Sequence, residues 1–150
     1  MAKDFARYWA LPLRVLIGVG FMIHGFPKLT GEGHAQFVGL LQKIGMPAPE
    51  LVGWFGGILE SFGGLLLVIG LFTAEVAALL VIQMFVALFR VHLPQGFSAA
   101  SGGIEVPFLY IAALLALFVG GPGPVSVDEN VLEPESRLRP PWLRHRVAHA

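Results

Sequence analysis

The sequence predicts an all-α fold, an integral membrane four-helix bundle with both termini in the cytoplasm. Its 150 residues are 55% hydrophobic and only 13% charged, and the mean hydropathy is +0.73. A soluble domain has about 25% charged residues. Charges are isolated from residue 10 to residue 121, whereas residues 128–146 hold four acids and four arginines. We therefore expect one lipid-embedded domain over residues 1–125 and a cytoplasmic tail over residues 126–150.

Four apolar segments approach the ~20 residues that a spanning helix needs. We expect the spans at about 8–26, 51–72, 74–91 and 103–119. Pro27 ends the first span, and Pro47 and Pro49 precede the second. Thr73 lies between the second and third spans, which predicts a tight hairpin. Both of these spans are apolar all round, a pattern that favours lipid rather than water as their surroundings.

Lysine and arginine counts near the span ends predict the orientation. The N-terminus carries Lys3, Arg7 and Arg14, and the tail carries four arginines between residues 137 and 146. The segments 28–50 and 92–103, interpreted as loops, hold fewer basic residues. Both termini are therefore expected on the cytoplasmic side and both loops on the outer side.

The overall charge and the missing cysteine limit the possible functions. The formal net charge is zero, so bulk electrostatics give no attraction to nucleic acid. The chain has no cysteine, which excludes a disulfide, a thiolate metal site and thiol–disulfide exchange by its own side chains. Any redox role therefore needs a bound cofactor or a group from a partner.

Six ionisable residues lie in or beside the expected spans. A charge inside a bilayer costs roughly 2.5–3.5 kcal/mol on insertion scales and usually faces the interior of a bundle. The predicted topology places all six near the outer side: His24, Lys28, Glu60, Arg90, His92 and Glu105. We expect them to converge on one outward-facing pocket.

Glu60 is the most deeply placed of the six. It shares a helical stripe with Gly53, Gly57 and Gly64, and small residues at that spacing let helices approach closely. The carboxylate is therefore expected to point into the bundle, where a paired or functional role is favoured. His24, beside it by topology, is interpreted first as a hydrogen-bond partner of Glu60, with a metal or haem ligand and a proton relay as alternatives.

The other four residues also have plainer interpretations. Lys28, Arg90 and His92 lie near the expected interface, where long or amphipathic side chains reach water. Glu105 stands in the first turn of a helix, where the macrodipole favours an acid. The set lacks the local spacing of a metal motif, and an internal salt-bridge network explains the same residues. No metal site is therefore predicted.

Motifs in all four expected spans resemble the DoxX family in their order and spacing. The motifs are Arg14–Gly18, His24–Leu29, Glu60–Leu65, Gly70–Thr73, His92, Glu105 and Gly121–Asp128. The resemblance covers residues 11–128 and implies a four-helix protein of the bacterial inner membrane. Some family members are subunits of a thiosulfate:quinone oxidoreductase, others are linked to membrane redox complexes that resist oxidative stress, and many have no known activity.

Three functions stay open at this point. The favoured one is a membrane subunit of a quinone-linked oxidoreductase system. In it Glu60 and His24 are the catalytic residues, and the binding residues are Lys28, Arg90, His92 and Glu105. The second is a small-ligand binding or transport protein, and the third is a non-catalytic membrane adaptor.

The expected partners follow from the same reasoning. The lipid bilayer surrounds the spans, and the resemblance implies other membrane or redox subunits, with quinone as the candidate cofactor. The Gly53–Gly57 face could pack within the bundle or join two copies of the chain in a homo-oligomer.

Overall fold

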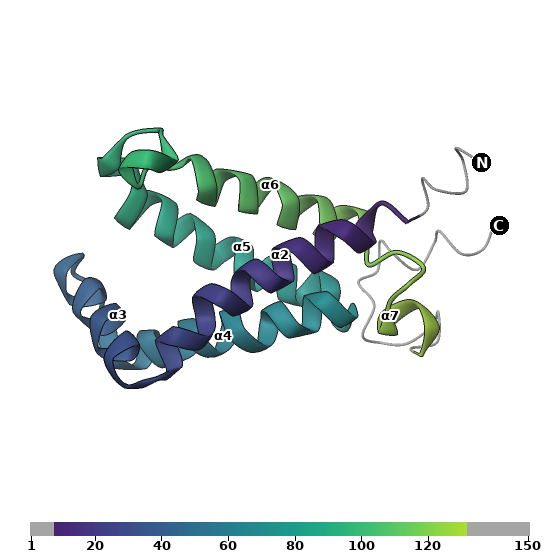
Figure 1. Cartoon of the computed structure of the whole chain (residues 1–150), viewed down its shortest axis with the longest axis horizontal. Coiled ribbons are helices and arrows are strands. Elements are labelled where there is room, and N and C mark those ends of the chain that lie inside the picture. The colour runs from purple at the N-terminus through teal and green to yellow at the C-terminus, as the bar shows by residue number, and fades with distance from the viewer. Residues whose placement is uncertain (1–7, 132–150) are drawn as a thin grey trace.

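The computed structural model describes residues 8–131, and within that range every regular element is helical, which confirms the all-α prediction. The long helices are α2 (Ala10–Gly25), α4 (Pro49–Ile69), α5 (Thr73–Ala87) and α6 (Glu105–Gly120). The shorter elements are η1 (Phe26–Leu29), α3 (Gly31–Lys43), the π-helix η2 (Leu88–His92), the 3₁₀ turns η3 (Leu93–Gln95) and η4 (Ala99–Ser101), and α7 (Val127–Asn130). Figure 1 shows how they are arranged. The predicted tail beyond residue 131 lies outside the described range.

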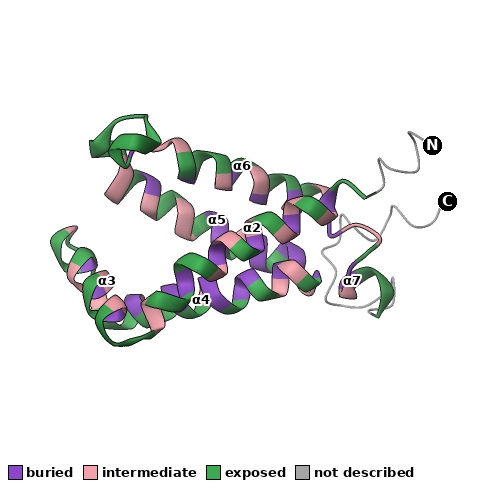
Figure 2. Ribbon diagram, viewed as in Figure 1, coloured by how far each residue is buried: buried purple, intermediate pink, exposed green. Residues whose placement is uncertain are grey.

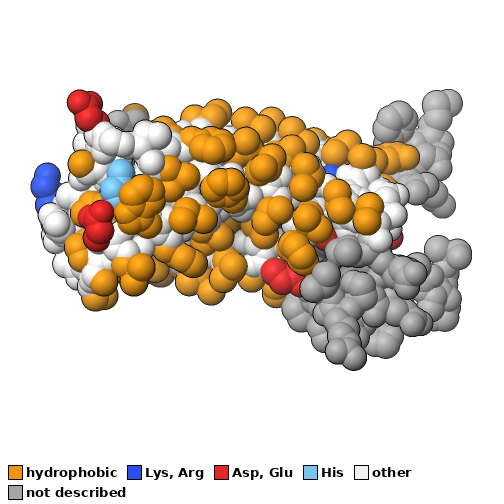
Figure 3. All heavy atoms as spheres, turned by 90° about the horizontal axis from the view of Figure 1, so that it is seen from below, with side chains coloured by type: hydrophobic (Ala, Val, Ile, Leu, Met, Phe, Trp, Pro, Cys, Tyr) orange, Lys and Arg blue, Asp and Glu red, His pale blue; other side chains and the backbone are white. Residues whose placement is uncertain are grey.

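Three helical stretches are long and apolar enough to cross a membrane: Ala10–Leu29, Pro49–Ile69 and Thr73–Gln95. The apolar helix α6 has 16 residues, about 24 Å at 1.5 Å per residue, which is below the ~30 Å of a hydrocarbon core. The fourth crossing therefore stays a prediction. Apolar side chains cover the middle of the face in Figure 3, with charged side chains toward the ends, as expected for a body surrounded by lipid.

Glycines bring α2 and α4 into close contact. A methyl group added at Gly18 would lie 2.5 Å from the backbone oxygen of Gly64, and one added at Gly64 would lie 2.5 Å from that of Gly18. The predicted stripe on α4 is buried, and within it Gly53 faces α3 and Gly57 faces η1. These glycines therefore serve packing within the chain.

The hydrophobic core lies where the α2–α4 pair meets α5 and α6. Leu67 on α4, Leu80 on α5 and Leu114 on α6 are fully buried. Phe21 on α2 meets Tyr110 on α6 edge to face, with ring centres 5.1 Å apart. In Figure 2 the long helices carry both buried and exposed positions along their length, and many exposed ones are apolar.

The segment 28–50 is not the loop that the sequence analysis expected. It contains η1 and the amphipathic helix α3, which packs against α4. His34, Val38 and Leu41 recur at helical spacing and are buried. The loop interpretation was wrong because it rested on stretches of spanning length, whereas a short helix needs only an apolar stripe on one side.

The chain after α6 folds back onto the turn between α4 and α5. The carboxylate of Asp128 accepts hydrogen bonds from the backbone N–H of Phe72 (2.8 Å) and of Thr73 (2.9 Å). Phe72 has a left-handed backbone with φ of 52°, a conformation that persists only where its surroundings hold it. Arg14 donates to the carbonyl oxygen of Val125, which ties the same segment to α2.

Candidate functional site

A cavity of about 490 Å³ lies between the α2–α4 pair, the α5–α6 pair and α3. Most of its lining is apolar. The polar lining residues are His24, Lys28, Glu60, Gln83, His92 and Tyr110. Small-molecule sites of roughly 300–1,000 Å³ have this character, a mainly apolar wall with a few placed polar groups.

Lys28 and Glu60 form an ion pair at the cavity wall. The Lys28 Nζ lies 2.6 Å from each carboxylate oxygen of Glu60. Glu60 is only 2% exposed, and a buried charge is costly unless it is paired and hydrogen-bonded. Because the two charges cancel, the pair can remain inside an apolar body.

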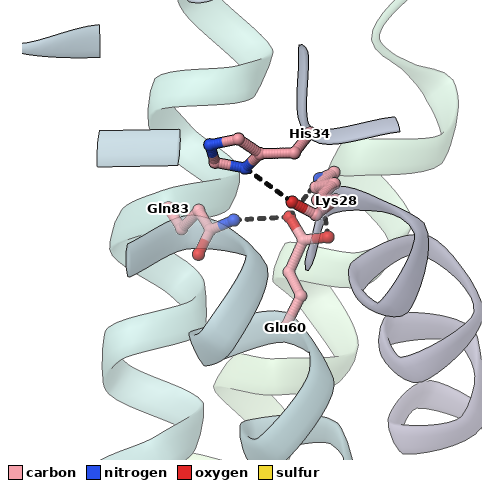
Figure 4. A network of polar contacts seen from close by, with 4 residues as sticks. All are labelled: Lys28, His34, Glu60 and Gln83. Atoms are coloured by element: carbon pink, nitrogen blue, oxygen red, sulfur yellow. Dashed lines mark hydrogen bonds and ion pairs between the residues drawn. The ribbon is translucent and has the colours of Figure 1, made fainter. Parts of the chain in front are cut away.

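Gln83 connects α5 to this ion pair. Its Nε2 donates to the Oε1 of Glu60, and an ionised carboxylate can only accept, which fixes the orientation of the amide. The Glu60 carboxylate on α4 therefore holds one donor from η1 and one from α5, as Figure 4 shows. We call Lys28, Glu60 and Gln83 the polar cluster.

His34 positions the turn that carries Lys28. The ring Nδ1 donates to the backbone oxygen of Lys28 at 2.8 Å (Figure 4), and Nε2 lies 3.1 Å from a carboxylate oxygen of Glu50. The imidazole also stacks on Trp54, with ring centres 4.1 Å apart. The Lys28 ammonium in turn lies 4.3 Å from the ring centre of Phe37. The sequence analysis gave His34 no role because it took the residue for part of a loop.

The two histidines predicted as site residues line the cavity from different elements. His24 is on α2, one turn before Lys28, and His92 ends the π-helix η2. The Nδ1 of His92 donates to the carbonyl oxygen of Gly102 at 2.6 Å. Pro94 accounts for the π-helix, because proline cannot donate to the carbonyl four residues earlier and its ring clashes there.

Arg90 and Glu105, also predicted as site residues, do not line the cavity. Arg90 donates to the carbonyl oxygen of Ile44 and so links η2 to the end of α3. Glu105 accepts a hydrogen bond from the backbone N–H of Ala99 at 2.8 Å. Both side chains bond the backbone of connecting segments, whose conformations the span pattern does not specify.

Gln83 and Tyr110 are cavity residues to which the sequence analysis gave no site role. An amide inside an apolar span is a signal in itself, because an unsatisfied polar group there is costly. The place of Tyr110 in the cavity wall depends on a contact that only the folded chain shows. Its hydroxyl lies against Gly20, and a methyl group added at Gly20 would be 2.1 Å from that oxygen. Among the described residues, no three His, Asp or Glu side chains form a group that could hold a metal ion.

Apolar helices of spanning length and a polar cluster at the wall of an apolar cavity define the class: a multi-pass membrane protein with an internal, mainly apolar cavity. The DoxX family model matches residues 9–93, more than half of the chain. The chain belongs to the DoxX family, as its motifs indicated.

Relatives of similar length match most of the chain. CatD of Bacillus subtilis, named as a candidate oxidoreductase, is 31% identical over 89% of this chain and 93% of its own. The inner membrane protein YphA of Escherichia coli is 31% identical over 78% and 86%. An uncharacterized protein of Haemophilus influenzae is 30% identical over 85% and 94%. No solved structure matches. The family, the name of YphA and the apolar helices agree on a multi-pass protein of the inner membrane.

Proposed function

We propose that this protein is the membrane subunit of a quinone-linked oxidoreductase system and holds the quinone ring in its internal cavity. The observation that carries the proposal is the polar cluster at the wall of an apolar cavity. The name of CatD as a candidate oxidoreductase supports the same class of function. Both termini lie in the cytoplasm in this proposal, and the cavity lies near the outer face.

The chemistry of a quinone suits the groups around the cavity. Its ring is apolar and planar, and each carbonyl oxygen accepts hydrogen bonds. The Lys28 ammonium has three N–H groups, of which Glu60 can take two. The third is available to a carbonyl oxygen, where a positive charge favours the negative charge that develops on reduction.

Reduction to the quinol requires two electrons and two protons. The chain has no cysteine, and in this proposal the electrons come from a partner subunit. Glu60 and His24 are assigned to proton handling, Glu60 through its bonded contact with Lys28 and His24 from its own position on the cavity wall. Lys28 and His92 are assigned to binding. Arg90 and Glu105 keep an indirect binding role, because they fix the segments that close the same end of the molecule.

Binding of a tail-less dimethoxymethylbenzoquinone to the purified protein in detergent tests the proposal. Glu60→Gln and Lys28→Met should each weaken binding about tenfold, since a hydrogen bond to a charged group contributes ~1.5–3 kcal/mol. Glu75→Gln is the matched control, because Glu75 is an exposed acid on α5 that does not line the cavity. Unchanged binding in the Glu60 and Lys28 variants would overturn the proposal.

A membrane adaptor is the second candidate, favoured by the way the polar cluster ties together η1, α4 and α5. Its role would then be to hold the helices in place. The double variant Lys28→Met with Glu60→Gln separates the two functions, because it removes both charges and leaves no buried charge unpaired. An adaptor predicts that this variant retains its cellular effect in proportion to protein level, whereas a quinone site predicts loss of that effect at normal protein level.

A further inference from the structure

We infer that the cavity opens sideways into the bilayer between α4 and α5, and that the quinone it takes carries a long alkyl or prenyl tail that leaves through this opening. The inference rests on the proposed function and names its substrate class. It assigns a tail site that is separate from the polar cluster, on residues with no hydrogen-bonding capacity in their side chains.

The opening is marked by apolar side chains that line the cavity and have a large exposed fraction. Phe55 on α4 is 59% exposed, and Ile82 on α5 is 62% exposed, yet both line the cavity. Leu79 and Val86 on α5 share both properties, as does Leu40 on α3. His24 on α2 and Val106 on α6 are also exposed lining residues, but most of the exposed lining belongs to α3, α4 and α5. We call the five apolar residues on these three helices the apolar rim.

The helix geometry explains why the mouth lies there. The α4–α5 turn at Gly70–Phe72 joins the two helices closely, and the cavity lies toward their other ends. There α3 packs against α4. Figure 1 shows α5 separating from α4 in this direction. A methyl group added at Gly56 would lie 3.4 Å from the Phe37 ring and 3.5 Å from the Gln83 amide nitrogen.

The composition of the rim selects the occupant. All five rim residues are apolar, and the four on α4 and α5 belong to stretches long and apolar enough to cross a membrane, so a water-soluble ligand gains nothing from them. The charged pair Lys28–Glu60 lies on the cavity wall, where the Glu60 side chain is buried and the Lys28 side chain is 23% exposed. A molecule whose ring carries carbonyl acceptors and a long apolar tail satisfies both ends, with its carbonyl oxygens at the polar cluster and its tail across the rim into lipid.

Selective blockage of the rim tests this inference. Because the chain has no native cysteine, a maleimide labels only the introduced one. Ile82→Cys is alkylated with a bulky maleimide in the full-length protein. Leu109→Cys is the matched control, because Leu109 is equally exposed at 61% but does not line the cavity. The two probes are the tail-less benzoquinone and its decyl-tailed counterpart, with affinities corrected for partition into detergent.

The unmodified protein should bind the tailed probe at least about tenfold more tightly, the gain expected from burying two methylene groups in the mouth. Alkylation of Ile82→Cys should remove that gain and leave binding of the tail-less probe unchanged, while alkylated Leu109→Cys should match the unmodified protein.

Three results would overturn the inference. Equal affinity for the two probes, with ring binding still dependent on Glu60, rejects the lateral mouth and leaves the proposed function standing. Equal competition by decanol shows that the cavity selects an alkyl chain without the ring, and rejects the named substrate class. Binding of neither probe rejects the proposed function and the inference together.

Discussion

At the scale of single residues, the molecule centres on one carboxylate. Glu60 is buried on an apolar helix, where an unpaired charge would be strongly unfavourable. Hydrogen bonds from Lys28 and Gln83 stabilise its carboxylate there. A buried pair of this kind adds little net stability by itself, but breaking it by removing one partner is costly. The effects of substitutions at Lys28 and Glu60 on stability are therefore coupled.

This dependence predicts the stability of three variants. Lys28→Met should lower the free energy of unfolding by roughly 1–3 kcal/mol, less than the ~3–5 kcal/mol of a fully buried pair, because Lys28 keeps partial exposure. Glu60→Gln should have a similar effect, and the double variant should recover at least half of the loss. Thermal unfolding midpoints in detergent measure all three. Additive losses in the double variant would contradict the coupling.

The sequence indicates Glu60 but not its partners. Its depth in an apolar span and its glycine stripe suffice to predict that it points inward and is paired. The partner expected from topology was His24, whereas the structure shows Glu60 accepting hydrogen bonds from Lys28 and Gln83. The reason is the 3₁₀ turn η1, which follows α2 directly and carries Lys28 over α4. No pattern of apolar residues specifies such a turn.

At the scale of elements, close backbone contact between α2 and α4 builds the wall on which the polar cluster stands. Neither helix has room for a side chain at Gly18 or Gly64, since any added atom meets the backbone of the other helix. The sequence predicted close helix packing along the glycine stripe of α4, which includes Gly64, but did not identify α2 or Gly18 as the partner. Helix α3 was not predicted at all, because it is half polar and too short to span.

Gly64→Val should separate α2 from α4 and strongly destabilise the protein. The clash is with backbone and cannot be relieved by a rotamer change, so a loss of at least about 2 kcal/mol is expected, at the upper end of the range for overpacking. Gly39→Ala is the control: Gly39 lies within α3, nothing lies within 4 Å of an added methyl group, and the helix should gain up to ~1 kcal/mol. A Gly64→Val protein with an unchanged unfolding midpoint would refute the close contact.

The hydrogen bonds of Asp128 join the C-terminal segment to the α4–α5 hairpin, and their loss should have a local effect. Asp128→Ala removes the acceptor for two N–H groups at the start of α5, and loss of such a cap costs ~0.5–2 kcal/mol. Hydrogen exchange should speed up at Phe72 and Thr73 and change little at the end of α5. Uniform acceleration over the whole chain would point to global unfolding instead and would contradict a local cap.

At the scale of the whole molecule, residues 8–131 form an apolar body with most ionisable groups toward its ends. The buried ones include Glu60 in the polar cluster, and Arg14 and Asp128 where the C-terminal segment meets the helices. Composition alone predicts this arrangement, because too few charges are present to cover a soluble domain. What composition leaves open is the number of crossings, since α6 has 16 residues, and the direction in which the chain enters the membrane.

The predicted orientation places residue 36 on the outer side and residue 129 on the cytoplasmic side. Single cysteines at Gln36 and Glu129, both exposed, can be introduced without background because the chain has no cysteine. In intact cells an impermeant maleimide should label Gln36→Cys and leave Glu129→Cys unlabelled until the membrane is broken. The reverse pattern would contradict the positive-inside argument. Labelling of both in intact cells would contradict the fourth crossing.

The most direct test of a quinone site in this cavity is photolabelling with an azidoquinone, followed by peptide mapping. The site predicts label on cavity-lining positions of α4 and α5 inside the rim, such as Leu59 and Met84, and predicts that excess unlabelled quinone removes it. Label spread over exposed positions outside the cavity, such as Leu16 and Leu109, and unaffected by the competitor, would contradict a quinone site in the cavity.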